Sequence, residues 1–451
     1  MCQIKSLCYN EFVQTKKEGL IYMTQTNCIK NLLNIEDENV NLYDNEVKIM
    51  EKNGNKTKYI HAYLTYTPKD CPKCGCLNEG FDDIIKWNFK RNCKIKLPKV
   101  SGYNFILLLD KQRFYCKHCS STFTATTSLV KPYKNISENS RLNIINDLMK
   151  KGDKKSISQN NNVSTNSTNR ILSEICKDTI LKNGGILPKS MGIDEFKATK
   201  DTKSKMAFII VDQGNKKIFD INNSRRSNDI ENYFKRYSKK QRDSVKYITL
   251  DLYKPYYKLM HSLFRNAVLI PDRFHIVIQF RNALDRTRID LCKRKNKDYG
   301  KLKKYWKLIL KNENDLDDKD KFYSANFRKE VTEQYIVTYL INTDITLQNT
   351  YKYYQGLLNS LKNKDKDKFT NIIHNISPCT SIYAKKANKT LLEMEKYISN
   401  AFDYDLSNGI VEGTNNVIKQ IKRTAYGYRK FQHLKTRVML IKGLYNPLKN
   451  A

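Results

Sequence analysis

The stretch Ser190-Met191-Gly192-Ile193-Asp194-Glu195-Phe196 decides the fold, because it begins a run of short apolar segments of strand length. Further strand candidates and one helix candidate, at 229–237, follow it; the strands lie at 206–211, 217–221, 245–250 and 267–270. Strands followed by helix–strand units predict an α/β sheet. The segments on either side have other patterns, so we expect a multidomain chain of α+β and α/β parts.

Acidic residues stand on or after three strands of this predicted sheet. Asp194 lies in the first strand, and Asp251 directly follows 245–250. Acids at the carboxyl ends of strands lie where the sites of α/β sheets form. Asp272 and His275 follow the next strand, so Asp272 is an alternative to Asp251, or forms an accessory pair with His275. For any one of these acids, a strand-end cap or a salt bridge is the commoner role.

Downstream, residues 276 to 400 are charged and predict long helices, and one further helix begins near Ser407. On that helix one stripe combines an acid with polar and basic residues: Glu412, Asn416, Lys419 and Arg423. The opposite side is apolar and predicts a core-facing surface. A carboxylate on such a stripe can present a metal ion to a polyanion, although an ordinary amphipathic surface helix has the same pattern.

Three of these acids, Asp194, Asp251 and Glu412, are candidates for one catalytic site. Together they could hold two Mg²⁺ or Mn²⁺ ions, since these ions prefer oxygen ligands. Paired metal ions stabilise both the attacking and the leaving oxygen at phosphorus.

Upstream of the sheet, residues 137–181 predict a short helical unit. Asn160-Asn161-Asn162 can turn the chain between two helices, and Ser164 is suited to cap the second one. This pattern is typical of a helix-turn-helix, although a plain helical hairpin is an alternative. The residues then available to a major groove are Thr165, Asn166, Ser167, Asn169 and Arg170.

Two C-x-x-C pairs lie further upstream, Cys71-Pro72-Lys73-Cys74 and Cys116-Lys117-His118-Cys119. Four thiolates at this spacing predict a structural Zn²⁺ site, because they leave no coordination position open. Cys76, Cys93 and His118 are possible substitute ligands, and a redox motif or a chance pairing is the alternative. Residues 87 to 109, between the pairs, can form strands beneath the site.

The composition indicates an anionic partner. Lys and Arg total 82 against 46 Asp and Glu, a formal charge of +36, which predicts binding to DNA or RNA. No apolar run is long enough for a membrane helix, and the amino terminus has no signal-peptide core. We therefore expect a cytoplasmic, nucleoid-associated protein without a membrane partner, whose 12 cysteines do not form a disulfide framework.

In combination, the cysteine pairs, the helical unit, Gly192-Ile193-Asp194-Glu195-Phe196, Asp272-Arg273-Phe274-His275 and 407–419 resemble the ISL3 family of insertion-sequence transposases. The resemblance implies an RNase H-like core with Asp194, Asp251 and Glu412 as its DDE acids. It also implies an all-helical insertion between the last core strand and the Glu412 helix. Asp272 and His275 are similar to an accessory motif of related transposases.

The domains that follow are an N-terminal segment, a zinc-binding module, a helix-turn-helix, the first part of the core, the insertion and the last part of the core. Their expected bounds are 1–67, 68–130, 137–181, 188–275, 276–400 and 401–451. The resemblance further implies an enzyme that binds the terminal inverted repeats of its element and cuts and joins DNA, as a homo-oligomer on paired ends. Phosphates would be held beside the site by Asn416, Lys419, Lys422, Arg423 and Arg429.

Two other functions fit part of the pattern. A zinc and helix-turn-helix regulator without catalysis explains the charge and the cysteines, but not the acids. An RNase H-like nuclease or resolvase explains the acids, but needs neither the amino-terminal modules nor the long helical segment.

Overall fold

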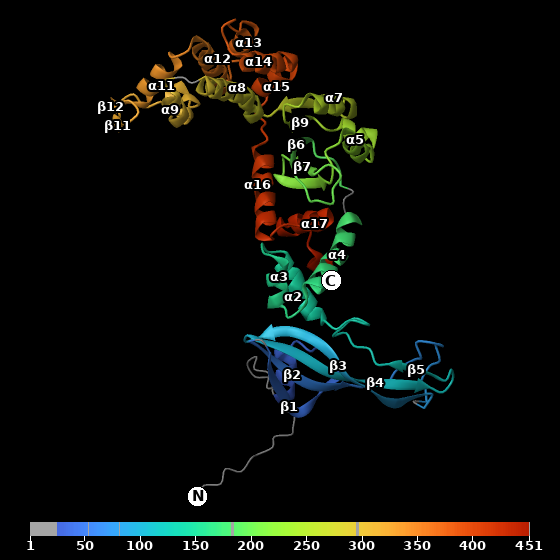
Figure 1. Ribbon diagram of the computed structural model, residues 1–451. Coiled ribbons are helices and arrows are strands. Elements are labelled where there is room, and N and C mark those ends of the chain that lie inside the picture. Colours follow the sequence, from blue (N-terminus) through green and yellow to red (C-terminus); the bar gives the residue numbers. More distant parts are fainter. Residues whose placement is uncertain (1–24, 53, 81, 182–184, 295–296, 451) are drawn as a thin grey trace, which may run out of the picture. The chain divides into compact units, whose positions relative to one another are not determined.

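The computed structural model describes residues 25–52, 54–80, 82–181, 185–294 and 297–450. The chain divides into two compact units (Figure 1). The first comprises Met1–Asp178, Thr424–Tyr426 and Met439–Ala451, and the second comprises Thr179–Arg423 and Gly427–Val438. Both contain helices and sheets, which confirms the mixed α and β class.

The first unit begins with a short helix, α1 (Gln25–Leu32), and a five-stranded sheet. The strands are β1 (Val40–Lys52), β2 (Asn55–Leu64), β3 (Ile84–Val100), β4 (Tyr103–Cys116) and β5 (Ser121–Thr124). Their order is β1-β2-β4-β3, with β5 also paired to β4; β2 and β4 are parallel, and the other pairs are antiparallel. The prediction of strands between the cysteine pairs is confirmed, because β3 and β4 occupy that segment.

Three helices follow: α2 (Glu138–Leu148), α3 (Lys154–Asn160) and α4 (Thr165–Leu181), of which α4 belongs to the first unit up to Asp178. Asn162 turns the chain with a positive φ of 50°, as expected for an asparagine turn. The Ser164 hydroxyl accepts the backbone N–H of Ser167 at 3.2 Å, so the predicted cap of α4 is confirmed.

The second unit contains the predicted α/β sheet, and each strand prediction is confirmed to within a few residues. The strands are β6 (Ser190–Lys197), β7 (Met206–Asp212), β8 (Lys217–Asn222), β9 (Tyr247–Leu250) and β10 (Val268–Pro271). Their order is β10-β9-β6-β7-β8. β6 is antiparallel to β7 and parallel to β9, which is parallel to β10, whereas β7 and β8 are antiparallel.

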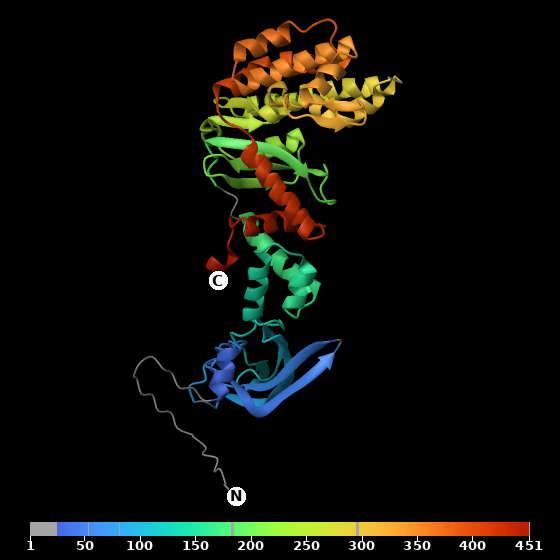
Figure 2. The same cartoon turned by 90° about the vertical axis from the view of Figure 1, so that its left-hand side faces the viewer.

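Helices cover this sheet through a shared apolar core. The connecting helices are α5 (Ser227–Lys235), α6 (Lys239–Asp243) and α7 (Lys254–Leu263). Phe234 of α5 and Met260 of α7 are buried in the same cluster as Phe208 of β7. α16 (Gly409–Thr424) runs alongside the sheet (Figure 2). α17 (Phe431–Ile441) follows it, and its first N–H, that of Phe431, is held by the carboxylate of Asp201 at 2.9 and 3.1 Å.

Most of the segment between β10 and α16 is helical, as predicted. The helices are α8 (Arg273–Lys293), α9 (Tyr299–Lys304), α10 (Trp306–Ile309), α11 (Glu333–Ile341), α12 (Ile345–Lys362), α13 (Lys366–His374), α14 (Ile382–Glu393) and α15 (Glu395–Asp403). The expectation of an all-helical insertion is wrong in one place, where β11 (Phe322–Ser324) and β12 (Lys329–Val331) form an antiparallel hairpin. Strands of three residues are too short to show a period of two, and Arg328 supplies the turn with a φ of 53°.

The end of the chain departs from the predicted domain 401–451. Residues 439–451 group with the first unit, where the terminal turn Pro447–Asn450 lies against α2. In the described part of the chain, no helix is both long and apolar enough to cross a membrane.

Candidate active site

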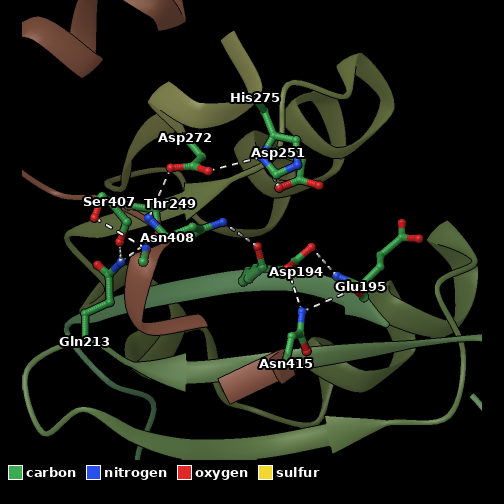
Figure 3. A network of polar contacts seen from close by, with 12 residues as sticks. Asp194, Glu195, Gln213, Thr249, Asp251, Asp272, His275, Ser407, Asn408 and Asn415 are labelled. Carbon is green, nitrogen blue, oxygen red and sulfur yellow. Dashed lines mark hydrogen bonds and ion pairs between the residues drawn. The ribbon is translucent and has the colours of Figure 1, made fainter. Parts of the chain in front are cut away.

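Asp194 lies on β6, the central strand of the second sheet. Its carboxylate accepts the backbone N–H of Glu195 and the side-chain amide of Asn415, each at 2.6 Å (Figure 3). Glu195, the next residue, is held by other partners: an ion pair with Arg225 at 2.9 Å and a hydrogen bond from Tyr256. The two neighbouring acids therefore have different partners, as expected because adjacent residues of a strand point to opposite faces of the sheet.

Asp251 directly follows β9, the strand that is parallel to β6. Its carboxylate is close enough to that of Asp194 for the two charges to interact. His275, in the first turn of α8, lies between two acids (Figure 3). Its Nδ1 is 3.0 Å from a carboxylate oxygen of Asp251 and 3.1 Å from one of Asp272. The Asp272 contact has the geometry of a hydrogen bond, whereas the Asp251 contact is an ion pair when His275 is protonated.

The pKa values at this site are displaced by burial and by crowding of like charges. Burial raises the pKa of Asp251, and the nearby Asp194 carboxylate raises it further, to about 7. Burial also raises the pKa of Asp194, although the Glu195 N–H, His275 and Asn415 oppose the shift. Burial alone would lower the pKa of His275, but Asp272 and Asp251 outweigh it and raise that pKa. Carboxylates that repel each other in this way are typical of functional sites.

The two candidates for the second acid differ in access. The side chain of Asp251 is 31% exposed and that of Asp272 is 9% exposed. Asp272 also accepts the backbone N–H of Asn408 at 3.3 Å, in addition to its bond with His275. Asp251 therefore has a carboxylate that an external ion can reach, whereas Asp272 is committed to contacts within the fold.

Glu412, the third predicted acid, lies in the first turn of α16 and is exposed. Its N–H donates to the carbonyl of Asn408 at 2.8 Å. Three residues later, Asn415 contacts Asp194, so Glu412 is less than one helical turn from that contact. Within the described ranges, only a group of four cysteines has its ligand atoms all within 4.8 Å of one another, so the three acids are less tightly assembled.

A buried polar network joins α16 to the sheet, and sequence reasoning missed it. The Asn408 amide donates to the carbonyl of Ile193 at 3.1 Å and accepts from Thr249. Gln213 donates to Thr249 at 2.7 Å and to the carbonyl of Ser407 at 3.0 Å. For Asn415 a signal was present, because it is a polar residue on the same helical side as Val411 and Ile418. For Gln213 we find no signal in the sequence.

The donor set fits a divalent cation. Asn415 Oδ1 is buried and accepts no hydrogen bond from any described residue, and Asp251 Oδ1 is buried with its ion pair to His275 as its one printed polar contact. A buried acceptor without a donor costs about 1–3 kcal/mol. A hydrated cation near Asp194 and Asp251 would give the Asn415 oxygen a partner and would relieve the repulsion between the carboxylates.

The polar stripe of α16 is largely accessible. Asn416, Lys419, Arg423 and Arg429 are exposed. Lys422 is different, because its ammonium donates to the carbonyls of Lys197 at 2.6 Å and Ala198 at 3.3 Å. Lys422 therefore fastens α16 to the end of β6, and its charge is less available to a phosphate than the sequence suggested.

The four predicted cysteines, Cys71, Cys74, Cys116 and Cys119, form the group whose sulfur atoms lie within 4.8 Å of one another. Two of the sulfur–sulfur distances are 3.7 and 3.8 Å. A tetrahedral zinc with Zn–S bonds of about 2.3 Å requires sulfur atoms about 3.8 Å apart. The cluster is thus compatible with zinc, and Cys76, Cys93 and His118 lie outside it.

The candidate groove-reading residues of α4 are only partly accessible. Thr165, Asn166 and Arg170 are exposed. Asn169 accepts a hydrogen bond from Lys154 at 2.9 Å. Ser167 was predicted to contact a groove. It is instead buried and bonded to Ser164 and Arg170, so it is not available to one.

Comparison with known proteins gives two matches. A protein of Lactococcus lactis subsp. lactis described as an ATP-dependent protease is 32% identical over 131 residues, which are 28% of this chain and 41% of that protein. The chain thus spans about two fifths of the length of that relative. Residues 191–438 match the ISL3-type DDE family, described as transposase. Because this match covers more than half of the chain and contains all three predicted acids, the protein belongs to the ISL3 family of DDE transposases.

Proposed function

We propose that this transposase binds the terminal inverted repeats of a bacterial insertion sequence and catalyses metal-dependent cleavage and transfer of DNA strands. The observation that carries the proposal is the pair of crowded carboxylates with raised pKa values, Asp194 on β6 and Asp251 directly after the adjacent parallel strand β9. The similarity to the Lactococcus protein does not support a function for the whole chain, because it covers 28% of this chain.

The sheet supports an RNase H-like core. Three antiparallel strands, β6 to β8, are extended by the parallel strands β9 and β10 on the β6 side. The first acid then lies on the central strand, the second follows the adjacent strand, and the third arrives on a helix after a long insertion. This is the arrangement that the family resemblance implies for a DDE site.

Asp194, Asp251 and Glu412 would hold the divalent ions, Mg²⁺ or Mn²⁺. Bound there, the ions would activate a water or a 3′-hydroxyl and stabilise charge at the phosphorus. The residues of the chain have their own tasks. His275, held by Asp272, would orient Asp251, and the two acids raise the pKa of His275, which favours its protonated form.

DNA contacts are proposed on two surfaces. On α16 and the residues after it, Asn416, Lys419, Arg423 and Arg429 would hold phosphates, with Lys422 as a partial contributor. On α4, Thr165, Asn166 and Arg170 would read the inverted repeat, as the second helix of a helix-turn-helix. The cysteine cluster would hold a structural zinc, and the protein would act as a homo-oligomer on paired ends.

The test uses purified protein, labelled DNA carrying the ends of its own element, and Mg²⁺ or Mn²⁺. We expect specific strand cleavage followed by joining to target DNA, and loss of both in Asp194→Asn and Glu412→Gln. Full activity in either variant would reject the assigned roles. The DNA flanking the gene should also show imperfect inverted repeats bracketed by a short direct duplication.

The same assay separates the two other functions. Sequence-specific binding without cleavage at any metal concentration would indicate a regulator. Cleavage without joining, on branched DNA rather than on element ends, would indicate a nuclease or resolvase.

A further inference from the structure

Asn415 makes two contacts with β6 from the buried side of α16. Its amide nitrogen donates to Asp194 Oδ2 at 2.6 Å and to the carbonyl of Glu195 at 3.3 Å. The residue is 4% exposed, and its Oδ1 accepts nothing from the described residues. Packing alone does not explain a buried amide whose N–H group bonds an acid and whose oxygen accepts no hydrogen bond. An apolar residue would avoid the free-energy cost of burying that oxygen without a partner.

Asn408, the residue directly before α16 and about two turns from Asn415, makes comparable contacts with the sheet. Its amide nitrogen donates to the carbonyl of Ile193, the residue before Asp194. Its amide oxygen accepts from Thr249, two residues before Asp251, and its backbone N–H donates to Asp272. One buried asparagine thus contacts the segments that carry three of the acids of the site (Figure 3).

Glu412 lies between these two residues, four positions after Asn408 and three before Asn415. Residues at these spacings are neighbours on a helix surface, so the exposed Glu412 lies at the margin of the buried side of α16 that the two asparagines anchor. Gly192 permits this close approach, because a Cβ at that position would lie 2.4 Å from Val411. The height and rotation of α16 against β6, and hence the place of Glu412, are set by these contacts.

We propose that Asn408 and Asn415 form an asparagine clamp that positions Glu412 and orients the carboxylate of Asp194 for cation binding. Both are positioning residues, and the proposal rests on the proposed function of the three acids. By engaging Oδ2 of Asp194 from the helix side, Asn415 limits the rotation of that carboxylate. Residues that support metal ligands in this way typically change metal affinity or activity by about 10–100-fold when they are removed.

The experiment measures Mn²⁺ binding by electron paramagnetic resonance on the full chain without DNA, and single-turnover cleavage with DNA. Asn415→Leu removes the donor while keeping a similar volume. We expect Mn²⁺ affinity to fall about tenfold and the cleavage rate to fall about 10–100-fold. Affinity for end DNA should stay within about twofold, since the clamp faces the protein interior.

Asn388 offers a matched control on α14. It is also 4% exposed, and it donates to the carbonyl of Ile373 at 2.8 Å and accepts from Tyr353 at 3.0 Å. Asn388→Leu should lower the melting temperature about as much as Asn415→Leu, but leave Mn²⁺ affinity unchanged. Thr249→Val is a milder second variant that removes the hydroxyl donor to Asn408, and it should weaken Mn²⁺ binding a few-fold. It tests the clamp even if Asn415→Leu does not fold.

The outcomes distinguish the clamp from the function on which it rests. Wild-type Mn²⁺ affinity in folded Asn415→Leu and in Thr249→Val, or an equal loss in Asn388→Leu, would overturn the clamp. Failure of the wild-type protein to cut any end DNA would overturn the proposed function instead, while the Mn²⁺ measurements would still test the clamp.

Discussion

The cysteine cluster of the first unit and the carboxylate site of the second are two candidate metal sites built in different ways. The cysteines come from two C-x-x-C pairs, one in the segment between β2 and β3 and one beginning at the last residue of β4, and their four sulfur atoms lie within 4.8 Å of one another. The acids come from two strands and a helix that are separated along the chain by the long insertion. Among these three acids, Asp194 raises the pKa of Asp251, while Glu412 is exposed.

This difference matches the difference between structural and catalytic metal chemistry. A closed four-thiolate site has no position for a substrate, whereas a catalytic ion needs one. A ligand carried on a separately anchored helix leaves room for DNA, at the cost of less exact placement. The comparison therefore predicts that metal loss unfolds the first site but inactivates the second without unfolding it.

Loss of zinc from the cysteine cluster should have the largest effect. Structural zinc in small modules contributes about 10 kcal/mol or more to folding. Cys74→Ser should therefore release the zinc and make the segment around β3 and β4 sensitive to protease, as measured by native mass spectrometry and limited proteolysis. Cys76→Ser is the control and should keep one zinc per chain, because Cys76 lies outside the cluster. A stable, zinc-loaded Cys74→Ser protein would contradict the comparison from this side.

Removal of an acid should abolish chemistry while leaving the fold intact. Metal ions stabilise transition-state charge by several kcal/mol, so Asp194→Asn and Asp251→Asn should each slow cleavage by about a thousandfold or more. Asp272→Asn should cost less, about 10–100-fold, because Asp272 acts through His275. Cleavage rates and thermal melts of the same preparations check both statements. If Asp272→Asn were the more severe variant, the second acid would be Asp272.

The same comparison explains what the sequence could reveal. Local spacing defines the cysteine pairs, and strand-length apolar runs define β6 to β10, so both were predictable. The acids at strand ends followed from the positions of those strands. Tertiary pairs were not predictable, since the Gln213 amide meets a carbonyl that lies 194 positions further along the chain. Asn415 gave a partial signal as a polar residue on an apolar helix side, whereas the β11–β12 hairpin was too short to give any.

The seat of α16 on β6 can be tested at Gly192. A methyl group there would lie 2.4 Å from Val411, so either the helix or the strand must move. Such overpacking typically costs about 1–3 kcal/mol, and we expect Gly192→Ala to lower both the melting temperature and Mn²⁺ affinity. Adding Val411→Ala should restore part of each, as a double-mutant cycle would measure.

Gly413→Ala is the matched control on α16, because a Cβ there meets nothing within 4 Å. Alanine favours a helix more than glycine does, so this variant should be neutral or slightly stabilising, by up to about 1 kcal/mol. A Gly192→Ala protein as stable and as active as the wild type would show that the close approach of α16 is not required.

The last prediction concerns pH at the carboxylate site. Burial and Asp194 raise the pKa of Asp251 to about 7, so the folded protein binds this proton more tightly than an exposed carboxyl group does. Below pH 7 a cation must displace the proton, and apparent Mn²⁺ affinity should fall by about tenfold per pH unit. Above pH 8 the affinity should level off.

Without metal the pH dependence has the opposite sign, because the raised pKa of Asp251 makes its charged form costly in the folded protein. Stability of the metal-free protein should therefore decline as pH rises from about 4 toward 7. Asp251→Asn should remove most of both slopes. A Mn²⁺ affinity that is flat between pH 6 and 8 in the wild type would mean that Asp251 does not bind the cation.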